Sequence, residues 1–199
     1  ESGAITIDRE LTIDLKGHII IFNNGNNDGK LFHVTENGKL IIKDSSGSSG
    51  TIISREGTPD SLICVTGGQL RLIGGTLKNI NGSHGIQAEG GTITIEGGQI
   101  ANSGTKITEG GGIYLKGSVF QMSGGQITDN IGERGGGIYA ADSSGILISG
   151  GSISNNTVPD SGGGLYIRNS ASEISGTAEI ANNVADLGGG ISFYEGARN

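Results

Sequence analysis

Short runs in which apolar and polar residues alternate recur along the chain, and Gly, Asn or Ser separates each run from the next. The stretch 110–135 is typical and contains three runs, at Ile113–Leu115, at Phe120–Met122 and around Ile127. Alternation with a period of two residues is the pattern of a strand with one buried face, and none of the runs is long enough for a helix. The pattern therefore predicts an all-β chain.

Two phrases recur in phase with each other at a period of about 26 residues, which indicates an internal structural repeat. The first, GGGIY or a variant of it, occurs at 110–117, 135–142, 162–169 and 188–195, with a weaker copy at 84–91. Its marker residues are spaced by 25 to 27 positions and are Ile86, Ile113, Ile138, Leu165 and Ile191. The second phrase, with a central GG in most copies, occurs at 70–80, 93–103, 120–130, 146–156 and 172–183.

Three strands in 26 residues are too few for a propeller blade, which needs four strands in roughly 40 residues. They instead make one triangular coil, and stacked coils give a parallel β-helix with about 4.8 Å between coils. We expect right-handed winding, three strands per coil and about seven coils. The prediction is one domain over 1–199, with capping and irregular coils at 1–60 and regular coils at 61–199. Because the chain ends inside a coil, we expect it to be a fragment of a longer protein.

Equivalent positions of the coils form columns, and the apolar columns are the expected core. The first strand contributes Ile86/Ala88, Ile113/Leu115, Ile138/Ala140, Leu165/Ile167 and Ile191/Phe193. The second contributes Leu70/Leu72, Ile93/Ile95, Phe120/Met122, Ile146/Ile148 and Ile174, and the third Leu77, Ile100, Ile127, Ile153 and Ile180. Gly pairs between the second and third strands predict sharp bends. Asn residues after the third strand predict a hydrogen-bonded ladder at the next turn: Asn102, Asn130, Asn155, Asn156, Asn182 and Asn183.

Composition and charge narrow the possible functions. Gly accounts for 40 of 199 residues, but Pro for only 2, which does not fit collagen. The net charge of −7 argues against nucleic acid as a partner, because phosphates must be neutralised by Lys and Arg. No apolar run approaches the roughly 20 residues of a membrane helix, so we expect no membrane insertion by this segment. The sequence predicts no metal site and no cofactor, since the Ca²⁺-binding nonapeptide motif is missing and Asp129, Asp160 and Asp186 do not share a column.

A His and a Cys invite a test for nucleophilic chemistry. The register of the strands makes His33 and Cys64 point outward in earlier coils. No third group is evident that would orient the His, so we expect no catalytic residues and favour a buried, unreactive Cys64.

The most informative column is the outward one on the first strand of each coil, which contains Tyr114, Tyr139 and Tyr166. Lys116 and Arg168 follow two residues after the first and last of these tyrosines. We interpret the three rings as an exposed strip that could bind a glycan or a peptide, because Tyr combines rigid area with a polar tip. The two cations would favour an acidic partner such as a sulfated or uronic glycan. The alternative is a tyrosine ladder that only stabilises the sheet.

The GGGI and IxxN phrases resemble the repeats of bacterial surface right-handed β-helix proteins. The matching residues are GGGI or GGGL ending at 113, 138, 165 and 191, and IxxN at Ile127–Asn130, Ile153–Asn156 and Ile180–Asn183. Among these proteins, the repeat is similar to polymorphic outer-membrane-protein-type repeats and to those of cell-wall adhesins. The resemblance implies an extracellular, cell-surface adhesin that is continuous with further domains.

We therefore expect a non-enzymatic adhesin domain that binds a host glycan or matrix protein, or that acts as a stalk. A polysaccharide lyase or glycoside hydrolase of the pectate-lyase-like fold is the alternative, but Glu89, Glu96 and Glu173 lie on different strands or distant coils. Ice binding would need a regular Thr array, and Thr92 and Thr94 have no matching columns. A phage tail or assembly role stays open.

Overall fold

The computed structural model describes residues 3–23, 29–47, 50–56, 60–80, 82–142 and 144–195. In this part of the chain the strands form three parallel sheets, and every third strand along the sequence belongs to the same sheet. The chain therefore winds in triangular coils, with one strand of each sheet per coil, as the repeat predicted.

The sheets are named here in the order in which the chain meets them. The first sheet contains β1 (Ile5–Ile7), β4 (Lys30–Val34), β7 (Ser61–Thr66), β10 (His84–Glu89), β13 (Ile113–Lys116), β16 (Ile138–Ala141), β19 (Leu165–Arg168) and β22 (Ile191–Tyr194). The second contains β2 (Glu10–Asp14), β5 (Lys39–Lys43), β8 (Gln69–Leu72), β11 (Thr92–Ile95), β14 (Val119–Met122), β17 (Gly145–Ile148) and β20 (Ala171–Ile174). The third contains β3 (Ile19–Asn23), β6 (Thr51–Glu56), β9 (Thr76–Asn79), β12 (Gln99–Ala101), β15 (Gln126–Thr128), β18 (Ser152–Ser154) and β21 (Glu179–Ala181).

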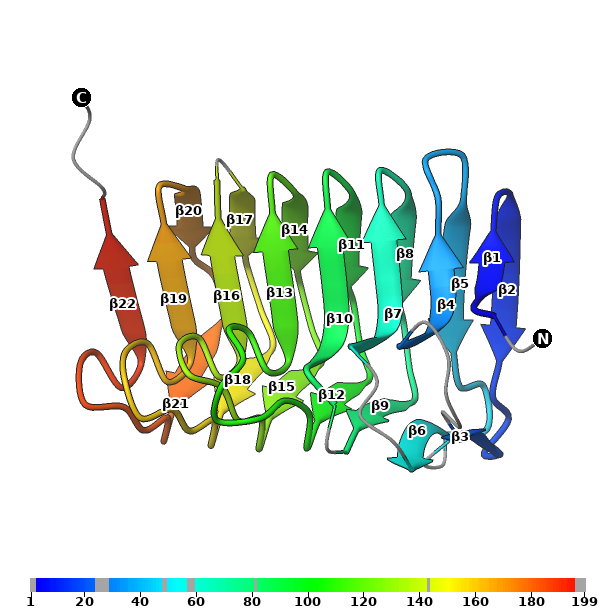
Figure 1. The fold of residues 1–199 in the computed structure, drawn as a ribbon, viewed down its shortest axis with the longest axis horizontal. Helices are drawn as coiled ribbons and strands as arrows, with labels where there is room; N and C mark the ends of the chain where they lie inside the picture. Colours follow the sequence, from blue (N-terminus) through cyan, green and yellow to red (C-terminus); the bar gives the residue numbers. More distant parts are fainter. Residues whose placement is uncertain are drawn as a thin grey trace.

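The coils stack into a rod with the N-terminus at one end and the C-terminus at the other (Figure 1). The register brings equivalent residues of successive coils together, so that Ile113 lies opposite Ile86 on one side and Ile138 on the other. The predicted parallel β-helix with three strands per coil and about seven coils is confirmed. The division into irregular coils at 1–60 and regular coils at 61–199 stays a prediction.

The core fills the inside of the rod and consists of the predicted apolar columns. Ile86, Ile113 and Ile138 are fully buried, as are their counterparts Ile93, Ile100 and Ile127 on the other two sheets. Burial decreases at both ends of the stack. In the first coil Ile5 is 51% exposed, and in the last Phe193 is 64% exposed, although both occupy inward positions.

The bend between the second and third sheets depends on glycine. Gly98 and Gly125 have φ angles of +75° and +78°, in the left-handed region that side chains disfavour. A Cβ on Gly98 would also lie 2.6 Å from the carbonyl oxygen of Gly75 in the neighbouring coil. The predicted role of the Gly pairs as sharp bends is therefore confirmed.

The Asn residues after the third sheet form two columns rather than one. Asn130, Asn156 and Asn183 make the ladder, in which each Nδ2 donates to a backbone carbonyl of the preceding coil at 2.8–3.0 Å. Within the ladder, Asn156 Oδ1 accepts bonds from the backbone N–H and the Nδ2 of Asn130, both at 3.0 Å. The residues just before the ladder have a different role, since Asn155 and Asn182 each have a φ of 56° at the corner itself. Asn tolerates this conformation better than most residues do.

Candidate functional site

The tyrosine column exists as the sequence predicted. Strand pairing places Tyr139 between Tyr114 and Tyr166 on three neighbouring strands of the first sheet. Their ring centroids are 5.5 Å and 5.3 Å apart, and both pairs are within 6° of parallel. The register places Gln87 opposite Tyr114, but the ring of His84 lies beside the column, with its centroid 5.3 Å from that of Tyr114 and its plane tilted by 37°. We call these four residues the aromatic ladder.

The prediction that these tyrosines form an exposed strip is wrong. Tyr139 is fully buried, Tyr166 is only 5% exposed and Tyr114 is partly buried. The cause is the loop that connects each strand of the third sheet to the next strand of the first sheet, from β12 onward. These loops bulge beside the ends at which the strands of the first sheet begin (Figure 1). At Gly135 a Cβ would lie 2.9 Å from the Cα of Tyr139, so the missing side chain lets the loop backbone pass directly over the strand.

Charged side chains border the aromatic ladder and neutralise one another. The guanidinium of Arg134 lies 5.6 Å from the ring centroid of Tyr166, and its nitrogens lie 3.1 Å from Glu109 and 3.4 Å from Asp160. Arg168, 6.0 Å from the Tyr139 ring, lies 3.2 Å from Asp142. Each arginine thus bridges neighbouring coils.

Burial, followed by the negative charge of Glu109, raises the pKa of Tyr139 above its usual value of 10.0. Burial likewise raises the pKa of Tyr114. Arg168 is already paired with a carboxylate, so it offers less to an acidic ligand than the sequence suggested. Lys116 is exposed at the end of β13. A role of Tyr114, Tyr139, Tyr166, Lys116 and Arg168 in binding stays a prediction.

His33 and Cys64 lie opposite each other on β4 and β7. Both are partly exposed, so the expectation of a buried Cys64 is wrong. The hydroxyl of Thr66 lies 3.1 Å from His33 Nε2 and 3.8 Å from Cys64 Sγ. Partial burial lowers the pKa of His33 below 6.5, which favours the neutral imidazole at neutral pH. The described residues contain no group of three or more His, Cys, Asp or Glu arranged to hold a metal ion.

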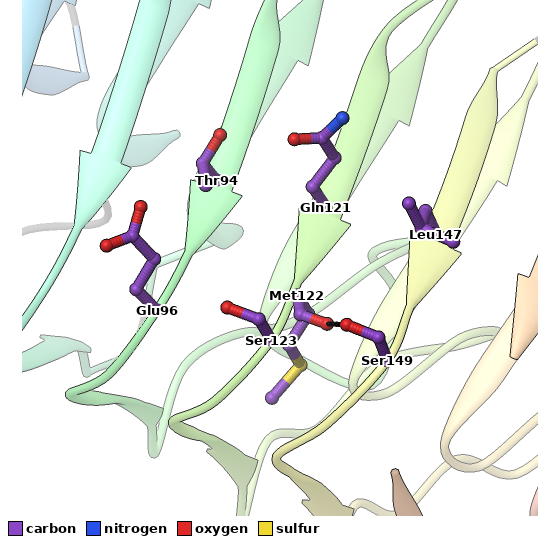
Figure 2. Close-up of a pocket in the computed structure, with 7 residues that line it drawn as sticks. All are labelled: Thr94, Glu96, Gln121, Met122, Ser123, Leu147 and Ser149. Atoms are coloured by element: carbon purple, nitrogen blue, oxygen red, sulfur yellow. Dashed lines mark hydrogen bonds between the residues drawn. The ribbon is translucent and has the colours of Figure 1, made fainter. Parts of the chain in front are cut away.

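The second sheet carries an open hollow that the sequence did not reveal. Figure 2 shows Thr94, Gln121 and Leu147 side by side on β11, β14 and β17, with Glu96, Ser123 and Ser149 beyond the ends of these strands. These residues and Met122 line a hollow of about 250 Å³. A second hollow of about 410 Å³ adjoins it and shares Gln121 and Leu147. We call the two together the second-sheet slot.

Short and uncharged side chains create the slot. The central strand β17 begins with Gly145, and a Cβ built there meets no atom within 4 Å. Ser149 is also small, and its hydroxyl donates to the carbonyl of Met122 at 3.4 Å. The signal was present in the sequence as a run of Thr, Gln, Ser and Gly at outward positions, with Leu147 as the exception, but such a run does not by itself indicate a hollow.

Carboxylates lie at the edges of the slot, not as a pair within it. Arg71 binds Glu96 with two hydrogen bonds of 2.6 Å and 2.7 Å and thereby lowers the pKa of Glu96 below 4.5. Glu173 lies at the other end of the slot, three strands further along the second sheet. At about 4.8 Å per strand, Glu96 and Glu173 are roughly 14 Å apart along the rod. Glycosidase carboxylates are separated by about 5–9.5 Å. Glu96 and Glu173 therefore do not flank a common sugar bond.

Comparison with known proteins adds the family. A family model described as a right handed beta helix region matches residues 61–199. The expected right-handed winding agrees with this match. No curated protein and no solved structure matches the chain. Over the described residues, no helix has the length and apolar character needed to cross a membrane.

Proposed function

The chain belongs to the family of right-handed β-helix proteins, and from that premise we propose that it is a non-enzymatic binding domain of a bacterial cell-surface adhesin. Its ligand is an extended polymer, a host glycan or a segment of a matrix protein, that lies along the rod. The repeat resemblance supports an extracellular location, and the low Cys content is compatible with it.

The second-sheet slot is the observation that carries this proposal. It is open to solvent, it runs across successive strands in the direction of the rod axis, and none of its residues is a paired catalytic carboxylate. A groove that crosses successive coils along the rod suits an extended ligand, because one chain can then contact several coils spaced about 4.8 Å apart. Specific binding without bond cleavage is the function that this geometry supports best.

Binding and cleavage are measured together to test the proposal. The purified chain is applied to an array of glycans and to immobilised matrix proteins, and each polysaccharide is assayed in parallel for newly formed reducing or unsaturated ends. We expect saturable binding to at least one ligand with no new ends. Release of new ends would favour the lyase or hydrolase instead, and no binding to any glycan or matrix protein would favour a stalk.

A further inference from the structure

We propose that the second-sheet slot binds an uncharged polysaccharide, and not the acidic glycan that the cations beside the aromatic ladder suggested. This inference rests on the proposed function and specifies its ligand. The argument uses the charge, the chemical character and the shape of the slot.

The charge of the slot disfavours an ionic ligand. Its central residues, Gln121, Leu147 and Ser149, are neutral. The carboxylate of Glu96 is already held by Arg71, and Glu173 lies at the far end. A sulfated or uronic chain along this path would face the carboxylate of Glu173 and would gain no free cation from the slot, since Arg71 is already paired with Glu96; like charges at close range are costly. An uncharged chain meets no such penalty.

The slot combines apolar and hydroxyl-bearing surfaces, as a sugar ring does. Val119 is 46% exposed and Leu147 38% exposed, so together they present apolar area to the C–H face of a ring. Gln121, Ser123 and Thr94 border that area and supply an amide and two hydroxyls for hydrogen bonds (Figure 2). Small-molecule binding sites in general combine an apolar surface with a few convergent polar groups, and here the polar groups are neutral.

The shape of the slot suits a chain more than a single sugar. The two hollows adjoin at Gln121 and Leu147 and together extend from β11 to β20. The aromatic ladder differs in each respect, because Tyr139 and Tyr166 are covered and the surrounding arginines are paired with carboxylates. The second sheet is thus the better binding face.

Three variants test the inference. Gln121→Glu removes the amide donor that would bind a sugar hydroxyl and replaces it by a carboxylate that a neutral sugar would have to desolvate. Gln126→Glu makes the same change on the third sheet of the same coil, and both side chains are exposed, so neither change disturbs the core. Gly145→Gln fills the adjoining hollow without adding charge. The φ angle of Gly145 is not in the left-handed region and its Cβ position is open, so the fold tolerates this change. Thermal unfolding followed by circular dichroism verifies that each variant is folded.

Affinity electrophoresis is carried out in gels that contain neutral β-glucan, xylan or galactomannan, and in gels that contain polygalacturonate or heparin. We expect a neutral polysaccharide to retard the wild-type chain and the Gln126→Glu variant equally. Gln121→Glu and Gly145→Gln should each weaken binding about tenfold or more, which corresponds to about 1.4 kcal/mol.

Each other outcome has a definite meaning. Retardation by acidic glycans only, or by none of the three neutral ones, overturns the inference. Neutral binding that is equally strong in Gln121→Glu and Gln126→Glu also overturns it, because the ligand then lies elsewhere. In these cases the proposed function survives if the array finds another glycan or a matrix protein, whereas it fails together with the inference if nothing binds.

Discussion

Replacing Asn156 by Ala should destabilise the fold far more than the loss of one polar side chain at a turn would suggest. Asn156 is fully buried. Its Nδ2 donates to the carbonyl of Ile127 at 3.0 Å and to Oδ1 of Asn183 at 2.9 Å. Its Oδ1 accepts from the backbone N–H and the Nδ2 of Asn130. The truncation therefore removes four hydrogen bonds that link three coils.

The magnitude follows from the groups that lose a partner. The backbone N–H of Asn130 and the carbonyl of Ile127 belong to fully buried residues. Each buried polar group left unsatisfied costs about 1–3 kcal/mol, and the truncated side chain leaves a small cavity as well. We expect a loss of about 3–5 kcal/mol in the free energy of unfolding.

The neighbouring residue provides a matched control. Asn155 is exposed and has a φ of 56°, which Gly adopts without strain. Asn155→Gly should therefore change stability by less than about 1 kcal/mol. Equilibrium unfolding in urea, followed by far-ultraviolet circular dichroism, measures both variants. Similar losses for the two would refute the assignment of the ladder to Asn156 and of the corner to Asn155.

Four further substitutions test other parts of the structure. Ile113→Asn puts a polar group into the apolar core and Tyr139→Ser empties a buried ring site, so each should cost about 3–5 kcal/mol in chemical unfolding; a much smaller cost for Tyr139→Ser would mean that the ring is exposed after all. The backbone N–H and hydroxyl of Ser45 lower the pKa of Asp14 to about 2, below its unfolded value near 3.8. The ionised carboxylate therefore stabilises the fold above about pH 4, and this contribution is lost as the pH falls towards 2. The melting temperature of Asp14→Asn should accordingly fall less steeply between pH 4 and pH 2 than that of the wild type, and parallel curves would contradict the shift. Arg134→Ala should expose the aromatic ladder, because the guanidinium lies against the ring of Tyr166. The chain has no Trp, so its tyrosine fluorescence can be observed directly, and acrylamide should quench it more strongly in the variant. Unchanged quenching would show that the loop backbone alone covers the rings.

The fold was predictable because its stabilising contacts repeat along the sequence. Ile113 and Ile138 occupy the same place in their coils, and the register of a parallel sheet places them opposite each other. A shift of one residue in any copy would turn the side chains of that copy to the opposite face. The five copies agree in their alternation, and this agreement identifies the inward columns. The family match over 61–199 covers the part of the chain where the phrases are most regular.

The candidate sites were less predictable because they depend on what lies outside the coils. Alternation shows that Tyr139 points outward, but it does not show whether a loop covers an outward residue, and here the loop containing Arg134 does so. The second-sheet slot arises where side chains are short, at Gly145 and Ser149. A strand pattern records which side faces the core and contains no direct signal for a hollow on the other side.

Side-chain nuclear magnetic resonance tests most directly whether the second sheet is the binding face. Oligosaccharides from the neutral β-glucan, xylan and galactomannan are titrated into labelled protein, while the side-chain amides of Gln121 and Gln126, the methyl groups of Leu147 and the ring of Tyr114 are observed. We predict saturable shifts of Gln121 and Leu147 with little change at Gln126 and Tyr114. Shifts centred on Tyr114, or equal shifts of the two glutamines, would contradict the assignment of binding to the second-sheet slot.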